Sequence, residues 1–250
     1  SVDGFSLKKH ISDLQSNGYT ILRNYLKNDY IHQIINELEK IYSFIKDDTF
    51  NLSKGYLPVG VQGTTLANDR LIGHLPIYNK IFLKLALGGE HLCILNEILN
   101  DKHYKLIPPN LPNYIIAQMN AREGRNALSW HNDVRFQAPG NNTFSVNGFL
   151  ALGNISERNG TLKIIPQSHK LGEYPNNSSL KDSNAVNLSM DTGDFVLFDS
   201  RLHHSTTDTT KNKEVWTILY TYRCWWVKPQ FDFWRYFDNN KTCIKELNSV

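Results

Sequence analysis

Apolar residues in the first hundred positions follow helical spacing. The clearest stretch comes just after Asn28 and Asp29, either of which is a suitable N-cap. Its apolar residues recur at steps of three and four and share one helical face: Ile31, Ile34, Ile35, Leu38, Ile41, Tyr42 and Ile45. Weaker patterns predict helices over residues 5–17, 78–87 and 90–99, and a strand over 19–22. Gly18 is well placed to end the first helix, because glycine readily adopts the left-handed conformation found there.

After Pro108 the pattern changes to short β runs separated by turn residues. The predicted strands cover residues 114–119, 143–152, 161–165, 195–198 and 215–222. Many short strands in succession are typical of a sandwich or a small barrel. Helices followed by strands predict an α+β fold with the helices packed on one face of the β unit. We expect a single domain over residues 1–250, helical over about 1–110 and β over about 111–230.

Composition narrows the class of protein. The 250 residues are 40% hydrophobic and 12% aromatic, which supports a large core and excludes a disordered chain. Lysine plus arginine (27) nearly balances aspartate plus glutamate (24), so binding to nucleic acid through bulk charge is not expected. No segment approaches the roughly 20 apolar residues of a membrane span, and we expect no membrane partner. No feature specifies an oligomer.

Cysteine usage bears on the compartment. Cys93, Cys224 and Cys243 lie far apart and form no CxxC pair. They indicate neither a disulfide framework nor a thiolate zinc site. We therefore expect a protein of a reducing, cytoplasmic setting.

The segment richest in candidate chemistry is Trp130-His131-Asn132-Asp133. Side chains two residues apart in an extended chain point to the same side, so His131 and Asp133 can bind one metal ion together. A third ligand is available from His203 or His204, of which only one can face the site because strand neighbours point to opposite sides. Two histidines and a carboxylate form the facial triad of non-haem Fe(II) oxygenases. The competing interpretation is that so short a pattern arises by chance.

Further segments follow the His-x-Asp segment in order. They are Asn159-Gly160-Thr161-Leu162-Lys163-Ile164-Ile165-Pro166-Gln167-Ser168-His169, then Gly193-Asp194-Phe195-Val196-Leu197-Phe198, then His203-His204-Ser205. Together they resemble the phytanoyl-CoA dioxygenase-like (PhyH) family over about residues 115–230. The resemblance implies a double-stranded β-helix (jelly-roll, cupin-like) core with the helices packed on one sheet. It also implies Fe(II) as the metal, 2-oxoglutarate as the cosubstrate and O₂ as the oxidant.

The same resemblance implies roles for particular residues. The family pattern His-x-Ser matches His203-His204-Ser205, which makes His203 the expected third ligand, beside His131 and Asp133, and makes these three the catalytic metal site. His204 is the alternative. Ser205 stands where the family places a polar contact to 2-oxoglutarate, and so does Gln118.

Family members usually carry an arginine about ten residues after the distal histidine, where it pairs with the far carboxylate of 2-oxoglutarate. This sequence has no arginine there. Lys213 lies about ten residues after His203 and is the favoured substitute, acting as a point cation. The other basic residues considered for this role are Arg122, Arg201 and Arg223. A further alternative is a cosubstrate site that is altered or lost.

The substrate implied by the resemblance is a small molecule, such as an amino-acid-like compound or a secondary metabolite. Arg122 and Arg135 bracket the His-x-Asp segment and would suit an anionic substrate, while Phe149 could line the pocket. Hydroxylation of a C–H bond is the default outcome, with desaturation or cyclisation as variants. Two alternatives stay open: a degenerate, non-catalytic jelly-roll protein that binds a ligand, and a metal-dependent enzyme that does not use 2-oxoglutarate.

Overall fold

The computed structural model describes residues 6–45, 70–100, 112–123, 127–134, 136–157, 160–175, 184–207 and 215–228. Its helices are α1 (Leu7–Asn17), α2 (Asn28–Ile45), α4 (Lys80–Leu87) and α5 (His91–Ile98), with the short turns η2 (Leu75–Ile77) and η3 (Ser168–Lys170). Its strands are β1 (Tyr19–Leu22), β2 (Arg70–Ile72), β3 (Tyr114–Glu123), β4 (Leu128–His131), β5 (Ser145–Ala151), β6 (Leu162–Ile164), β7 (Val186–Leu188), β8 (Phe195–Asp199), β9 (His204–Thr206) and β10 (Trp216–Cys224).

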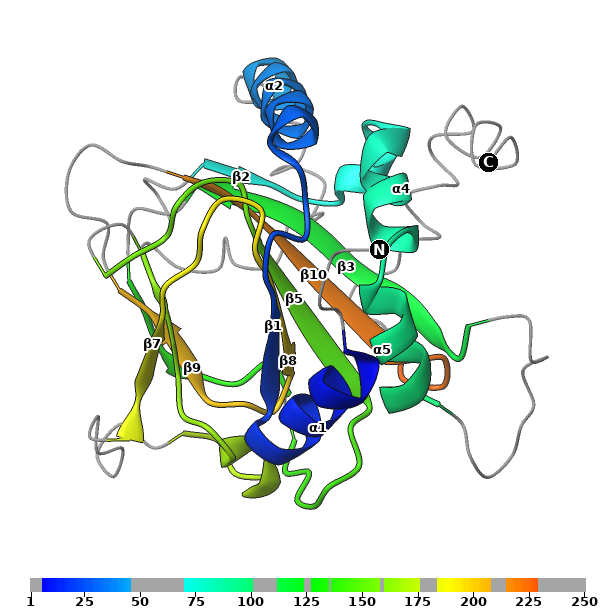
Figure 1. Cartoon of the computed structure of the whole chain (residues 1–250), viewed down its shortest axis with the longest axis vertical. Coiled ribbons are helices and arrows are strands. Elements are labelled where there is room, and N and C mark those ends of the chain that lie inside the picture. Colours follow the sequence, from blue (N-terminus) through cyan, green and yellow to red (C-terminus); the bar gives the residue numbers. More distant parts are fainter. Residues whose placement is uncertain are drawn as a thin grey trace.

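The strands form two antiparallel sheets (Figure 1). Six strands make the larger sheet in the order β1-β8-β5-β10-β3-β2, and four make the smaller sheet in the order β4-β9-β6-β7. A buried apolar cluster joins the two sheets, because Phe149, Val196 and Phe198 of the larger one share it with Leu162 and Ile164 of the smaller one. Two antiparallel sheets packed in this way are the architecture of the expected jelly roll.

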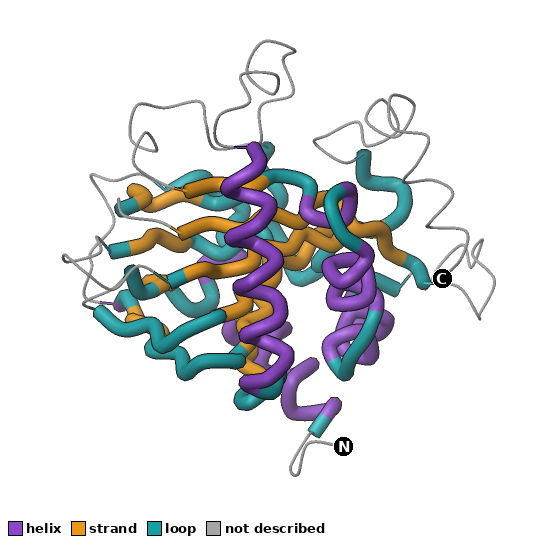
Figure 2. Tube along the Cα trace, turned by 90° about the horizontal axis from the view of Figure 1, so that it is seen from above, coloured by secondary structure: helices purple, strands orange, loops and turns teal. Residues whose placement is uncertain are grey.

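The helices cover the outer face of the larger sheet, and they lie on one side of the strands in Figure 2. Their contact with the sheet is a second and larger apolar cluster, in which α2 supplies Ile31, Ile34 and Leu38. These are residues of the apolar face that the sequence predicts, so burial of that stripe fixes how α2 sits on the protein. The predicted packing of helices on one sheet is confirmed.

Strand β10 shows how the sheet separates its two faces. Its even-numbered residues all lie in the helix-facing core: Trp216, Ile218, Tyr220, Tyr222 and Cys224. The alternate residues point toward the smaller sheet, and three of them are only half-buried: Leu219, Thr221 and Arg223. The inner face of the larger sheet is therefore partly open to solvent, whereas its outer face is sealed.

Two glycines are required where they stand. Gly18 ends α1 with φ of 87°, and its N–H donates to the Leu14 carbonyl, as the sequence predicts. Gly148 of β5 lies under the ring of Phe195, and a Cβ at this position would come within 2.5 Å of that ring. A larger residue there would displace a fully buried aromatic side chain.

The predicted helices and the longer strands are confirmed, with small differences at their ends. Strand β3 extends to Glu123 rather than ending at residue 119. The short strands β2, β4, β7 and β9 escaped the sequence analysis, since three or four residues carry too little periodicity. Among the residues that the structure describes, no helix is both long enough and apolar enough to span a membrane.

Candidate metal centre

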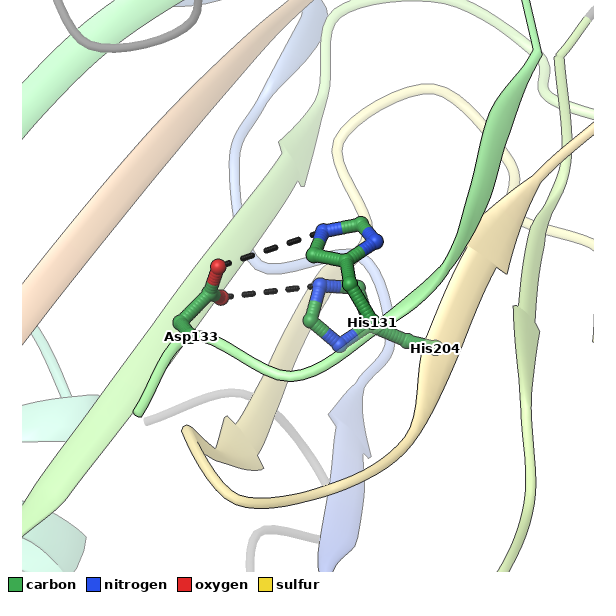
Figure 3. A group of neighbouring side chains, drawn as sticks. All are labelled: His131, Asp133 and His204. Carbon is green, nitrogen blue, oxygen red and sulfur yellow. Dashed lines mark ion pairs between the residues drawn. The ribbon is translucent and has the colours of Figure 1, made fainter. Parts of the chain in front are cut away.

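His131, Asp133 and His204 come together at the edge between the two sheets (Figure 3). The His204 Nε2 atom lies 3.5 Å from one carboxylate oxygen of Asp133, and the His131 Nε2 atom lies 3.9 Å from the other. One potential ligand atom from each residue falls within 4.8 Å of the others. Atoms that bind one ion at about 2.1 Å lie roughly 3 Å apart, so small side-chain rotations would bring all three onto a metal.

Both imidazole rings are held in the form that a metal requires. The His131 Nδ1 atom lies 2.7 Å from the Ser129 carbonyl, and the His204 Nδ1 atom lies 2.9 Å from the Leu202 carbonyl. A carbonyl only accepts, so in each ring Nδ1 carries the proton and Nε2 keeps its lone pair. Both lone pairs therefore belong to the nitrogens that face Asp133, and this donor set fits a divalent transition metal.

The backbone brings the three ligands together from two strands. His131 ends β4 and pairs directly with His204, which begins β9. Asp133 follows β4 in a bend, where its N–H donates to the Ser200 carbonyl at 2.9 Å. The site thus depends on contacts between residues about seventy positions apart, which sequence periodicity does not report.

The Asp133 carboxylate is also held from the larger sheet. The Asn147 side chain donates from Nδ2 to the carboxylate oxygen Oδ2, and the Thr221 hydroxyl donates to the Asn147 amide oxygen at 3.0 Å. Gln118 is the register partner of Thr221 on β3, which places it in the same row across the inner face. These residues form a polar line, from β3 through β10 and β5, that ends at the candidate ligand.

His203, the expected third ligand, does not lie in the cluster, and His204 takes its place. The His203 Nε2 atom lies 2.8 Å from the Glu173 carbonyl, away from the cluster that His204 joins. Adjacent residues of an extended chain point to opposite sides, and His204, the first residue of β9, is the one that faces the cluster. The same alternation affects Ser205, which pairs with Lys163 and so lies on the face of β9 opposite His204. Ser205 therefore does not point toward the site.

Of the other residues predicted to contact the substrate or the cosubstrate, the structure describes Phe149 and Arg122. Phe149 is buried in the apolar cluster between the sheets, two residues along β5 from Asn147. Arg122 pairs with Thr217 near the far end of β3, and its carbonyl accepts a hydrogen bond from the Thr217 hydroxyl. Lys213 and Arg135 fall outside the described residues.

Two of the alternative cations differ in their surroundings. The Arg201 guanidinium is buried and donates to both carboxylate oxygens of Asp199 and to the carbonyls of Ala138 and Gly140, so it serves the fold. Arg223 instead lies on the half-open inner face of β10, on the side of Asp133. Burial lowers its pKa, and the charge of Asp133 opposes that shift.

Electrostatics separate the two histidines of the cluster. His204 is buried, whereas the side chain of His131 is 26% exposed and that of Asp133 is 41% exposed. Burial lowers the pKa of His204, and the neighbouring His131 adds to this effect, while Asp133 opposes it. His204 is thus neutral near pH 7, as a ligand imidazole must be. The exposed side of Asp133 gives access from solvent.

Known proteins resemble this chain in sequence and in fold. The family model described as phytanoyl-CoA dioxygenase (PhyH) matches residues 14–214, which is most of the chain. The chain belongs to the phytanoyl-CoA dioxygenase family. Dioxygenase af480 from Aspergillus fumigatus is 28% identical over 158 residues, covering 62% of this chain and 48% of the relative. This chain therefore spans about half the length of that protein.

Solved structures in the same comparison share the fold of this PhyH-family chain. HygX from Streptomyces hygroscopicus, with nickel and 2-oxoglutarate bound, has a TM-score of 0.66 at 13% identity over 89% of both chains. The epimerase SnoN, in complex with Fe3+, alpha ketoglutarate and nogalamycin RO, has a TM-score of 0.62 at 12% identity over 87% of this chain and 83% of its own. The expected family and the jelly-roll fold are confirmed.

Proposed function

We propose that this PhyH-family dioxygenase oxidises a C–H bond of a small molecule at a metal held by His131, Asp133 and His204. The observation that carries the assignment is the pair of Nδ1–carbonyl contacts, which leaves both Nε2 lone pairs facing one carboxylate. Fe(II) bound at this site would supply the oxidising power together with O₂ and 2-oxoglutarate, which would be converted to succinate and CO₂. Hydroxylation is the default outcome, with desaturation or cyclisation as variants.

The chain's own residues would orient the reacting groups. Asn147 and Thr221 fix the Asp133 carboxylate from one side, so its remaining oxygen lies toward His131. Gln118, in the same row, is placed to contact the cosubstrate from β3. Lys213 stays the proposed partner of the far carboxylate of 2-oxoglutarate. Arg122, which pairs with Thr217 near the start of β10, is an alternative. A cytoplasmic setting and a single domain remain part of this proposal.

Arg223 supports a substrate that carries an acidic group. Its buried Nε–H has no hydrogen-bond partner among the described residues, while one Nη donates to the Lys228 carbonyl at 3.0 Å. A buried donor without a partner costs free energy, which an anionic ligand would recover. Since Arg223 shares the inner face with Thr221, such an anion would lie beside the metal ligands.

The test of the metal and cosubstrate is spectroscopic. Anaerobic addition of Fe(II) and 2-oxoglutarate should produce the visible charge-transfer band of a chelated keto acid. His204→Ala should abolish the band, and His32→Gln, on the exposed face of α2, should leave it intact. A protein without the band would be the non-catalytic binder or an enzyme that does not use 2-oxoglutarate.

The substrate class is tested by succinate release with paired compounds. We expect carboxylic acids to stimulate turnover more than their matched amides, and Arg223→Gln to remove this preference by raising KM about tenfold or more while changing kcat less. Equal stimulation by acids and amides would overturn the role of Arg223 without affecting the metal assignment.

A further inference from the structure

The two segments that carry the candidate ligands meet on a single backbone carbonyl. The Glu173 carbonyl oxygen lies 3.1 Å from the Asn132 Nδ2 donor and 2.8 Å from the His203 Nε2 atom. Asn132 stands between His131 and Asp133, and His203 directly precedes His204. A carbonyl oxygen has two lone pairs and can accept both hydrogen bonds at once.

Each donor points away from the metal side of its own segment. Asn132 and His203 are 8% and 4% exposed, so water competes little for either hydrogen bond. The His203 Nδ1 atom is buried and has no partner within the described part of the chain, which agrees with a ring whose proton sits on Nε2 and is donated to Glu173. His203 is thus committed to this contact in its neutral form.

The accepting loop is itself fixed to both segments. The Ala138 N–H donates to the Gly172 carbonyl at 3.2 Å, which ties the loop after Asp133 to the loop that carries Glu173. The Ser168 hydroxyl oxygen accepts from the His203 N–H at 2.8 Å and donates to the Ile165 carbonyl at 2.7 Å. The Glu173 carbonyl therefore belongs to a rigid support rather than to an isolated loop.

We propose that Asn132 and His203 are positioning residues, which set the distance between the two ligand-bearing segments through the Glu173 carbonyl. This inference rests on the proposed metal site and gives His203 a role different from that of a ligand. Ligands held at the required spacing before the metal arrives lose less freedom on binding, so the contact raises metal affinity. Outer partners of metal ligands typically contribute about 10–100-fold in affinity.

The test compares substitutions that keep or remove the donor. His203→Gln places an amide N–H near the position of Nε2, whereas His203→Phe keeps a ring without a donor. We expect His203→Phe and Asn132→Asp each to weaken Ni(II) binding by about tenfold or more, and His203→Gln to restore affinity to within about threefold of the unchanged protein. Ni(II) affinity would be measured by competition with a chelator, under conditions where circular dichroism shows each variant fully folded.

The matched control is His169→Phe. His169 is also a buried histidine. Its Nδ1 atom also lacks a partner among the residues that the structure describes, and its Nε2 atom lies 3.2 Å from the Gln15 carbonyl of α1 instead. It should lower the free energy of unfolding without changing Ni(II) affinity. If His203→Phe behaves in the same way, the positioning role is wrong and His203 only stabilises the fold. If the unchanged protein binds no Ni(II), the proposed metal site fails instead.

Discussion

The two faces of β10 differ in their burial and in their roles. Tyr220 and Tyr222 face the helices in a sealed, largely apolar core, whereas Thr221 and Arg223 face the smaller sheet and stay half-buried. On the outer face, the Tyr222 hydroxyl is satisfied within the fold, because it donates to the Ala86 carbonyl and contacts His91. On the inner face, the Thr221 hydroxyl donates to Asn147, which in turn donates to Asp133. The helix-facing side of β10 therefore contributes to the stability of the fold, and its other side supports the candidate metal site.

The largest effect should come from removing the carboxylate at the end of the inner face. We expect Asp133→Ala to reduce succinate release by about a thousandfold or more, because one of three metal ligands is lost. Asp133 is 41% exposed, but its removal leaves the buried Asn147 amide without this acceptor, so the free energy of unfolding of the metal-free protein should fall by about 1–3 kcal/mol. Urea denaturation would check this; a fully unfolded variant would show that the inner face also carries stability.

Neighbouring apolar residues on β10 offer a direct contrast. Ile218 is fully buried among the helix-facing residues, while Leu219 is half-buried on the inner face. Ile218→Ala should lower the free energy of unfolding by about 2–5 kcal/mol through the lost burial and the cavity left behind. Leu219→Ala should cost less than half as much. Equal losses in urea denaturation would contradict the difference between the two faces.

The outer core should also make stability depend on pH. Burial lowers the pKa of His91 from 6.5 to about 4. The unfolded chain therefore binds a proton near pH 6.5 that the folded protein refuses until about pH 4, so stability is present above pH 6.5 and is lost as the pH falls toward 4. The loss attributable to His91 is on the order of 3 kcal/mol.

His91→Phe should remove about 3 kcal/mol of the change in the free energy of unfolding between about pH 6.5 and 4, while His74 and His204, whose pKa values burial also lowers to about 4, keep part of the slope. His32→Gln, an exposed position on α2, is the matched control and should leave the slope as it is. If the slope is unchanged in His91→Phe, the pH dependence comes from other groups and the role of His91 is wrong.

The smallest contrast concerns two adjacent hydroxyl groups. Tyr222→Phe removes a donor to the Ala86 carbonyl and a partner of His91, so we expect a loss of about 1–3 kcal/mol in stability with unchanged Ni(II) affinity. Thr221→Val removes the donor to Asn147, so we expect a few-fold loss in Ni(II) affinity and about 1 kcal/mol or less in stability. The reverse pattern in the two measurements would be inconsistent with the separation of faces.

Periodicity predicted much of this fold because its physical cause is local. The apolar stripe of α2 and the helix end at Gly18 follow from neighbouring residues, and the structure agrees with both. The pair His131 and Asp133 was also predictable, since two residues of one extended segment share a side. The choice between His203 and His204 depends on where β9 begins, and pairing with β4 decides that.

The supporting residues were harder to find for the same reason. Asn147 is a polar residue in a strand whose every position is buried, and that contrast was the available signal. Its partners Asp133 and Thr221 lie on other strands, so no local pattern connects the three. Asn132 and His203 contact the backbone carbonyl of Glu173, so the residue type at position 173 does not indicate this contact.

If His131, Asp133 and His204 hold one metal ion, the same substitution at the adjacent positions 203 and 204 should have opposite consequences. Ni(II) titration, followed by anaerobic Fe(II) and 2-oxoglutarate absorbance, should be carried out on His204→Gln and His203→Gln. We expect His204→Gln to bind Ni(II) at least a hundredfold more weakly and to give no charge-transfer band, and we expect His203→Gln to keep near-normal binding and the band. Loss of metal by His203→Gln with retention by His204→Gln would contradict this metal site.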